Sequence, residues 1–513
     1  MRRLTLTFVL FGLLLNAAAQ QWVLDYGEIG YAAALNGGVL DSKGNNFMVG
    51  FMGRIIRNEV PYRYPYVLRT DAFENHESRC FEEDCFRNII PVRCIQLNNG
   101  NYFIACEEID TVPNIYNPQP IHSHFEIIIL NQDLDIVSER RYAIDAVANS
   151  FEVGQLLLDD DGSVVLCGSY IVYQSNWYPY RPVFYRFDEE GNILAYRYAQ
   201  PDEQSDEYRL WLFECHQLMK HPQSDGYLII GEGAWGATAM IFYDREFNYV
   251  DDIEIEKETG HPFFDMYAHS DFWFSDDEML LLGSFLSSFS QRYQTLGLLR
   301  LKTDGSIVQY DTLCQRVDTT IMVVNNHGMV YINDTTIFGA YYAFDDACYP
   351  VYSGLCLFDS DMELLGNVFF DEEEYCDFGA YFSLPTSDGC CIVSMSDWST
   401  NPDKPTGKIV KMRREDFNPI PCDVHEVPKQ EMQASVFPNP AKDEVHFDIT
   451  ALPQDGENRI CITDNLGRVR MSRIIRGEGN LLTVGVSSLE PGVYAYVIYN
   501  SQNELLKGKF VKE

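Results

Sequence analysis

The sequence predicts an all-β protein, in which a seven-bladed β-propeller is followed by a small β-sandwich of the immunoglobulin type. Three observations lead to this prediction. A unit of four short strands recurs seven times, as in repeat architectures built from sheets. Its strands are joined by tight turns rich in Asp and Gly. From Val436 onward the pattern changes to alternating apolar residues bounded by Gly and Pro, as in a small antiparallel sandwich.

The first 19 residues have the pattern of a signal peptide. Arg2 and Arg3 precede an apolar run over residues 4–15 and an A-x-A site that ends at Ala19. A spanning helix needs about 20 apolar residues, and Asn16 ends this run too early. We therefore expect cleavage after Ala19, and we expect no transmembrane segment in the rest of the chain.

The clearest repeat lies between Phe151 and Ala199. It has a first acidic turn at residues 159–162, a long middle loop, and a second acidic turn at residues 188–191. Asp suits such turns because its side chain bonds the local backbone, and Gly because it accepts positive φ. Counting this unit, the first turn occurs seven times, at residues 41–44, 98–100, 159–162, 224–226, 276–278, 333–335 and 387–389. The second turn recurs at residues 303–305, 359–361 and 413–416.

Seven four-strand units favour a closed propeller over a pair of β-sandwiches or a stacked solenoid. The last unit lacks a fourth strand, which either Trp22–Tyr26 or the segment 422–427 could supply. The repeats resemble the propeller-like repeats of large exported proteins of the Bacteroidetes phylum, a likeness that implies no activity. The expected organisation is a signal peptide at 1–19, a propeller at 20–427, a linker at 428–435 and a tail domain at 436–513.

The tail carries four short motifs in a fixed order. A Pro-Asn-Pro opening comes first, a D-x-x-G turn and an L-x-x-G-x-Y segment follow, and a basic strand ends the chain. The residues that carry these motifs are Pro438, Asn439, Pro440, Asp464, Gly467, Gly492, Tyr494 and Lys509. Together they resemble the type A C-terminal sorting domain of the type IX secretion system, also called the Por secretion system. An ordinary immunoglobulin-like accessory domain is the alternative.

This resemblance implies a location and a partner. The chain would pass the inner and outer membranes with the type IX secretion machinery, lose its tail, and remain at the cell surface or leave the cell. The formal net charge of −38 disfavours nucleic acid and anionic membranes as partners. Only 9 basic and 10 acidic residues follow Val436, so the body carries this charge.

The fourteen cysteines permit disulfides in an exported protein, and their connectivity stays open. Cys80 and Cys85 are close enough in sequence for a local bridge. Cys390 and Cys391 are adjacent in an apolar run, where we expect them to pack on opposite sides of a strand.

No catalytic motif is present, since the sequence has no G-x-S-x-G, H-E-x-x-H or Walker pattern. His122 and His124 would share one face of a strand, but a metal site needs further ligands. Turns such as Asp159–Asp161 make calcium a candidate ligand, although solvated hairpin turns explain them equally well. We predict no other cofactor. With 76 acidic residues, a glycosidase pair stays open and unlocated.

The middle loops of the repeats are rich in Tyr, Trp and Arg, residues that bind partners and stack on sugars. The predicted ligand-binding residues are Tyr62, Tyr64, Tyr66, Trp177, Tyr178, Tyr180, Arg181, Trp235 and Trp398. Tyr116, Tyr341 and Tyr342 are assigned to the same loops. The alternative is that these rings only pack the loops together.

The leading hypothesis is therefore a non-enzymatic surface or secreted propeller that binds a protein or glycan. The alternative is a glycan- or peptide-degrading hydrolase or lyase with carboxylates in the propeller channel. A purely structural surface component is a third possibility.

Overall fold

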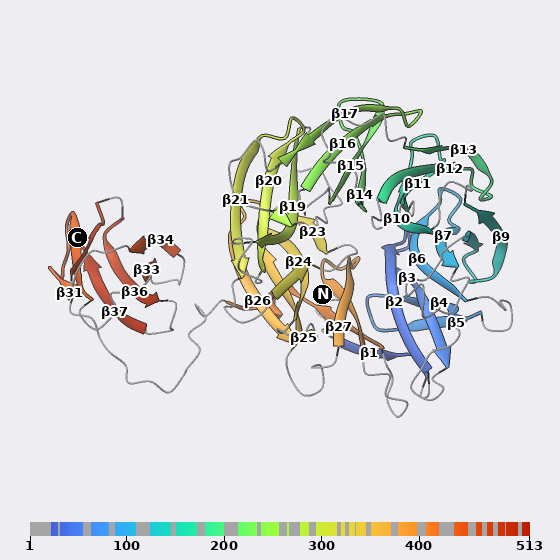
Figure 1. Cartoon of the computed structure of the whole chain (residues 1–513). Helices are drawn as coiled ribbons and strands as arrows, with labels where there is room; N and C mark the ends of the chain where they lie inside the picture. Colours follow the sequence, from blue (N-terminus) through green and yellow to red (C-terminus); the bar gives the residue numbers. More distant parts are fainter. Residues whose placement is uncertain are drawn as a thin grey trace, which may run out of the picture. The chain divides into compact units, whose positions relative to one another are not determined.

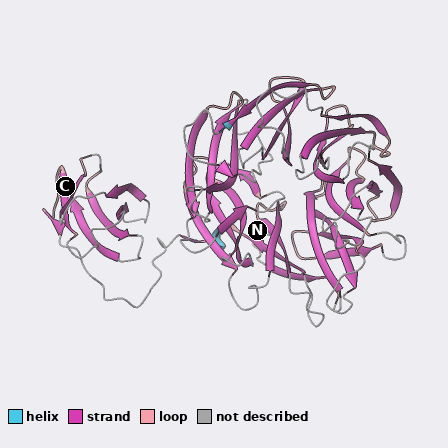
Figure 2. Ribbon diagram, viewed as in Figure 1, coloured by secondary structure: helices cyan, strands magenta, loops and turns pink. Residues whose placement is uncertain are grey.

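The computed structural model describes 24 segments of the chain. They are residues 22–28, 31–54, 63–81, 88–108, 124–144, 150–171, 180–199, 214–232, 238–255, 264–265, 277–286, 294–314, 320–323, 328–333, 335–344, 350–370, 378–397, 407–419, 436–449, 458–463, 469–475, 481–487, 489–500 and 505–513. The chain separates into two compact units, Met1–Asn418 and Pro419–Glu513, here called the body and the tail. Strands dominate both units (Figure 2), as the all-β prediction requires. None of the helices in these segments is long and apolar enough to cross a membrane.

The described part of the body forms seven sheets, numbered here in chain order. The first contains β2 (Tyr31–Leu40), β3 (Asn46–Arg54), β4 (Tyr64–Thr70) and β5 (His76–Cys80). The second contains β6 (Ile89–Gln96), β7 (Tyr102–Glu108), β8 (His124–Leu130) and β9 (Ile136–Ala143). The third contains β10 (Ser150–Leu158), β11 (Val164–Ile171), β12 (Tyr180–Phe187) and β13 (Ile193–Tyr198).

The next three sheets repeat this antiparallel order. The fourth contains β14 (Glu214–Lys220), β15 (Gly226–Glu232), β16 (Thr238–Asp244) and β17 (Tyr249–Glu254). The fifth contains β18 (Phe264–Asp265), β19 (Glu278–Leu286), β20 (Gln294–Lys302) and β21 (Ile307–Cys314). The sixth contains β22 (Thr320–Val323), β23 (Met329–Asn333), β24 (Thr336–Phe344), β25 (Pro350–Phe358), β26 (Leu364–Phe370) and β30 (Asn418–Pro419), and both β22 and β23 pair with β24.

The seventh sheet joins the two ends of the body. Its strands are β27 (Phe378–Pro385), β28 (Cys391–Asp397), β29 (Gly407–Met412) and β1 (Trp22–Tyr26). The outer strand β1 pairs with β29 in antiparallel register, with Trp22 opposite Lys411 and Tyr26 opposite Gly407. The first of the two closure candidates therefore supplies the fourth strand, while the segment 422–427 lies outside the described residues. A short 3-10 helix, η4 (Arg414–Asp416), follows β29.

The core of the body is divided among the spaces between successive sheets. Side chains alternate along a strand, so each sheet contributes one set to each neighbour. In β3, Phe47 and Val49 pack toward the second sheet, while Met48 and Met52 pack toward the seventh. Seven apolar clusters of this kind join each described sheet to the next and the seventh back to the first. The sheets follow one another around a common centre (Figure 1), which is a propeller-like arrangement.

Bulges recur at both edges of the sheets. The innermost strands β2, β6, β10, β14 and β27 each shift register near their middle. On the outermost strands, the extra residues are Val137, Leu194, Val250, Val308 and Leu365. Bulges increase strand twist and disrupt the pairing pattern of an exposed edge, so those outer edges are poor templates for another strand.

Of the two cysteines expected on one strand, only Cys391 lies in it, and Cys390 ends the turn before β28. Cys391 lies in β28 within the cluster between the sixth and seventh sheets, and Cys390 precedes it with 3% exposure. Burial raises the pKa of Cys390 to about 11 and also raises that of Cys391, so both thiols are poor nucleophiles. Cys80 ends β5, and its expected partner Cys85 lies outside the described residues.

The described tail has two sheets around one apolar core. The first contains β31 (Val436–Phe437), β32 (Glu444–Asp448) and β35 (Leu481–Gly485). The second contains β33 (Asn458–Thr463), β34 (Val469–Ile475), β36 (Gly492–Asn500) and β37 (Leu505–Lys512). Val445 and Phe447 of the first sheet share a cluster with Ile460 and Tyr496 of the second, because alternate residues of both sheets point inward.

Candidate binding face

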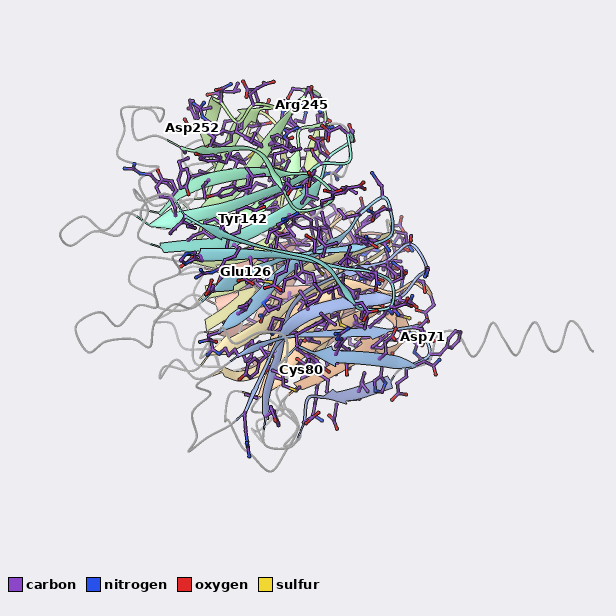
Figure 3. All side chains as sticks on the ribbon, turned by 90° about the vertical axis from the view of Figure 1, so that its right-hand side faces the viewer. Asp71, Cys80, Glu126, Tyr142, Arg245 and Asp252 are labelled. Atoms are coloured by element: carbon purple, nitrogen blue, oxygen red, sulfur yellow. The ribbon has the colours of Figure 1, made fainter. Side chains whose placement is uncertain are left out.

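The two ends of the body sheets are built differently. At one end, here called the turn face, five-residue turns such as 41–45 and 71–75 join neighbouring strands. At the other end, here called the loop face, the strands run into segments outside the described residues, such as 55–62 and 109–123. Asp71, at the turn face, lies on the opposite side of the body from Glu126, near the loop face (Figure 3).

The turns have the predicted chemistry. The Asp41 Oδ1 atom accepts hydrogen bonds from the backbone N–H groups of Lys43 at 2.9 Å and Asn45 at 2.8 Å. Gly44 adopts a φ of 83°, a conformation that Gly adopts without strain. The same arrangement returns at Asp188 with Gly191, where φ is 81°.

Polar side chains on the turn face also tie neighbouring sheets together. The Tyr102 hydroxyl donates to Asp41 Oδ2 at 2.7 Å, which links the second sheet to the first. The Tyr227 hydroxyl donates to Asp159 Oδ2 at 2.6 Å and makes the equivalent link between the fourth and third sheets. Burial, followed by the bond to Asp41, raises the pKa of Tyr102 to about 12. Because charge-assisted bonds of this type stabilise a fixed geometry, the turn face is braced from sheet to sheet.

The expected calcium turn is one of these braced sites. Asp159 is bonded by Tyr227 and by the Lys220 Nζ atom at 3.1 Å, and Asp161 by the Arg245 Nη2 atom at 2.6 Å. Hydrogen bonds from the Ser163 side chain and backbone lower the pKa of Asp161 to about 2. The protein's own cations therefore neutralise these carboxylates, and calcium would have to displace them.

At the loop face, the second sheet presents a charged cluster. The Arg141 guanidinium on β9 donates to both Glu108 oxygens on β7, at 2.5 Å from Nε and 3.0 Å from Nη2. The Glu126 side chain on β8 is fully buried, and its Oε1 atom lies 4.0 Å from the Arg141 Nε atom. One guanidinium thus serves two carboxylates at the base of the segment 109–123.

The third sheet presents an aromatic ladder instead. The Tyr185 and Tyr198 hydroxyls are 2.6 Å apart, and the Tyr170 hydroxyl donates to the Ala199 carbonyl at 2.7 Å. Tyr196 on β13 is 58% exposed, and its ring stacks on Tyr185 at 5.9 Å. An exposed ring that is held by buried rings is a preformed apolar contact surface.

The predicted ligand-binding residues have different placements. Tyr64 begins β4 and is half-buried, whereas Tyr66 is 4% exposed and Arg181 is 8% exposed. Tyr66 belongs to the cluster between the seventh and first sheets, so this ring supports the fold. Tyr180 begins β12, and its side chain is not described. Tyr62, Trp177, Tyr178, Trp235 and Trp398 lie outside the described residues, and their role stays a prediction.

Tyr341 and Tyr342 correct the assignment of the middle loops. Both lie within β24, and Tyr341 is fully buried between the fifth and sixth sheets. Its hydroxyl donates to Asn367 Oδ1 at 2.8 Å. Sequence reasoning also missed Tyr196 as a surface residue. Residues 194–196 of β13 are exposed in succession, so period-2 alternation could not have indicated this ring.

The expected histidine pair is only partly described. His124 begins β8 directly opposite Glu108 of β7, while His122 lies outside the described residues. No group of three or more His, Cys, Asp or Glu side chains in the described segments is arranged to hold a metal ion.

In the tail, the motif residues serve the fold. Tyr494 is 6% exposed, its ring stacks on Phe510 at 5.6 Å, and its hydroxyl donates to the Glu490 carbonyl. The Asn439 Oδ1 atom accepts a hydrogen bond from the Val511 N–H group at 2.8 Å. Pro438, Pro440 and Lys509 are exposed and Gly492 is half-buried, while Asp464 and Gly467 lie outside the described residues.

Comparisons with known proteins give one family match. Residues 435–513 match the model of a secretion system C-terminal sorting domain. The chain has no match among the curated proteins.

Among solved structures, the chain is similar to three proteins of low sequence identity. A protein of unknown function from Dyadobacter fermentans has a TM-score of 0.44 and 10% identity, over 76% of this chain and 99% of the other. The polysaccharide lyase Uly1 has a TM-score of 0.44 and 9% identity, over 76% and 91%. The β-propeller domain of the Trilobed protease from Pyrococcus furiosus has a TM-score of 0.33 and 12% identity, over 68% and 85%. At these scores, none of the three carries an argument about activity.

Proposed function

Residues 435–513 are a C-terminal sorting domain of the type IX secretion system, and we propose that the exported body binds a protein or glycan through its loop face. The sorting domain marks the chain for export to the cell surface or the extracellular space. In this proposal the body is a closed seven-bladed propeller, and the tail is an immunoglobulin-like sandwich of type A. The signal peptide at 1–19 starts export, and the propeller at 20–427 is the working part. The linker at 428–435 separates it from the tail at 436–513.

Support for the closed ring comes from the seventh sheet. It combines the first described strand of the body with β27, β28 and β29, and it shares an apolar cluster with the first sheet through Tyr26, Tyr66 and Leu68. The Tyr26 hydroxyl also accepts a hydrogen bond from the Leu35 N–H group at 3.2 Å. Such contacts are expected when the two ends of a propeller close on each other.

The observation that carries the binding proposal is the contrast between the two faces. Turn-face carboxylates such as Asp41 and Asp159 are bonded to neighbouring sheets. The strands of the loop face lead into segments outside the described residues, which contain predicted aromatic residues such as Trp177 and Tyr178. Binding residues are usually carried by loops on a rigid scaffold. The Tyr196 ring extends an apolar contact surface down the outer side of the third sheet.

Two measurements test this proposal. Deletion of residues 435–513 is expected to stop export and leave the protein in the periplasm. The purified full chain is expected to be retained on an array of neutral glycans or matrix proteins. The double variant Trp177→Ala/Tyr178→Ala should lose that retention, and Phe73→Ala should keep it, because Phe73 is an aromatic residue on the turn face with 58% exposure.

The outcomes separate the hypotheses. No retention of the wild-type chain on any array contradicts binding. Turnover of a polysaccharide or peptide panel would instead favour the hydrolase or lyase alternative.

A further inference from the structure

The four-stranded sheet of the tail has an inner and an outer side. Along β36, Tyr494, Tyr496 and Ile498 point into the apolar core. Because side chains alternate along a strand, Val493 and Ala495 point to the outer side. On β37, Phe510 is in the core, which places Lys509 and Val511 on the outer side as well.

The outer side carries an exposed apolar pair. Val493 and Val511 are direct cross-strand partners, 50% and 38% exposed. The next pair on the same side is Ala495 with Lys509, and Lys509 is exposed. Directly paired side chains on one sheet face are in contact range, so the two valines form one apolar patch with a lysine beside it.

This patch is held rigidly by the Pro-Asn-Pro opening. The Asn439 side chain binds the Val511 N–H group, the Ala441 N–H group donates to the Val511 carbonyl at 2.8 Å, and the Glu513 N–H group donates to the Ala441 carbonyl at 2.9 Å. Ala441 also forms a parallel bridge with Lys512. The backbone on both sides of Val511 is therefore fixed, although its side chain is open to solvent.

The motif residues of the tail therefore divide into two groups, because some are buried or bonded within the domain and others, such as Lys509, are exposed. Tyr494 and Phe510 are buried in the core, and Asn439 bonds the last strand. These residues shape the domain, but a partner protein can touch little of the two buried rings. A partner can touch Val493, Val511 and Lys509.

We propose that Val493, Val511 and Lys509 form the contact surface by which the outer-membrane secretion machinery recognises the tail. This inference rests on the sorting role stated above. The occupant is a protein surface with a shallow apolar groove and a carboxylate placed to meet Lys509. Charge supports this partner, because Lys509 is an exposed cation beside the two valines, and the tail is nearly neutral within a chain of net charge −38. An acidic group on the receptor is therefore repelled less by the tail than by the body.

The test measures export of the full chain from its native host. The variants are Val493→Thr/Val511→Thr, which keeps the branched shape that strands favour, and Lys509→Glu. The matched controls are Leu481→Thr, an apolar residue of the other tail sheet with 43% exposure, and Lys442→Glu, whose side chain is 78% exposed. For each variant, immunoblots measure the amount of the protein in the surface, medium and periplasm fractions.

We expect the exported fraction to fall at least tenfold for both test variants and to stay within twofold of wild type for both controls. Resistance of the periplasmic species to limited proteolysis should equal that of wild type, which separates lost recognition from unfolding. Normal export of both test variants, or equal loss in the controls, would overturn the assignment of the surface. If the chain without residues 435–513 is still exported, the sorting role itself fails, and the two failures are therefore distinguishable.

Discussion

Replacing Lys411 tests how the seventh sheet is joined to the first. Lys411 lies on β29, and its side chain is fully buried. Its Nζ atom lies 2.5 Å from Asp388 Oδ2 and donates to the Ala72 carbonyl of the first sheet at 2.9 Å. The variant Lys411→Met keeps the apolar length of the side chain and removes its charge.

The expected cost follows from burial. Removing one partner of a buried ion pair costs about 3–5 kcal/mol, because the other charge is left uncompensated. The Asp388 side chain is 10% exposed and keeps the hydrogen bond from the Thr386 hydroxyl at 2.5 Å. We therefore expect the lower end, about 3 kcal/mol, which is about a hundredfold in the unfolding equilibrium.

A matched control lies on the same strand. Lys408 also pairs with an aspartate, Asp25, at 2.9 Å, but the Asp25 side chain is 55% exposed. An ion pair with an exposed partner contributes about 0–1 kcal/mol, so Lys408→Met should cost little. The double variant Lys411→Met/Asp388→Asn should recover much of the loss, because no buried charge remains.

Urea unfolding followed by tryptophan fluorescence measures these differences. All six tryptophans precede the tail, so the signal reports the body. If Lys411→Met and Lys408→Met differ by less than about 1 kcal/mol, the burial argument is refuted.

Three further predictions concern the turn face. Tyr227→Phe should lower the free energy of unfolding in urea by about 1.5–3 kcal/mol. The Asp159 side chain is 2% exposed and loses its 2.6 Å hydrogen bond from the Tyr227 hydroxyl. An unchanged urea midpoint would contradict a brace between the third and fourth sheets. Phe247→Gly relieves about 1 kcal/mol of strain at a φ of 64° but loses about 3–5 kcal/mol of aromatic packing. Its thermal midpoint should therefore fall. Glu74 also has a positive φ, of 72°, but it is exposed, so the thermal midpoint of Glu74→Gly should stay the same or rise slightly. The pKa of Asp161 is about 2 in the folded protein and about 3.9 in the unfolded chain. The ionised Asp161 therefore stabilises the fold above about pH 4, and this stabilisation is lost as the pH falls toward 2. The stability gap between wild type and Asp161→Asn should close over that range, and a constant gap would be evidence against this linkage.

The turns were predictable because their causes are local. Asp41 and Gly44 bond and bend the chain within five residues, so the sequence alone indicates where strands reverse. Three equivalent turns have Leu134, Phe247 and Met362 at the left-handed position, with φ between 61° and 65°. Their burial in the clusters between sheets offsets the strain, a compensation that no local pattern reveals.

Among the aromatic residues too, the sequence pattern does not reveal burial that depends on contacts with distant parts of the chain. Tyr341 stands in a Tyr-rich stretch that resembles a loop in sequence, yet it is fully buried in β24. Its environment is set by Leu282, Leu296 and Met362, which come from other parts of the chain. Contacts between sheets decide which rings face solvent, so the candidate face could be predicted only in outline.

The pairing of β1 with β29 has a consequence for how the body could be cut and rejoined. Because β1 pairs with a strand from the far end of the body, the seventh sheet does not depend on one particular starting point of the polypeptide. A break in any loop-face connection would leave two fragments held together by the remaining sheet contacts and apolar clusters. By the same reasoning, the sequence order could be rotated so that the chain begins at another sheet, provided that a short linker joins η4 to β1.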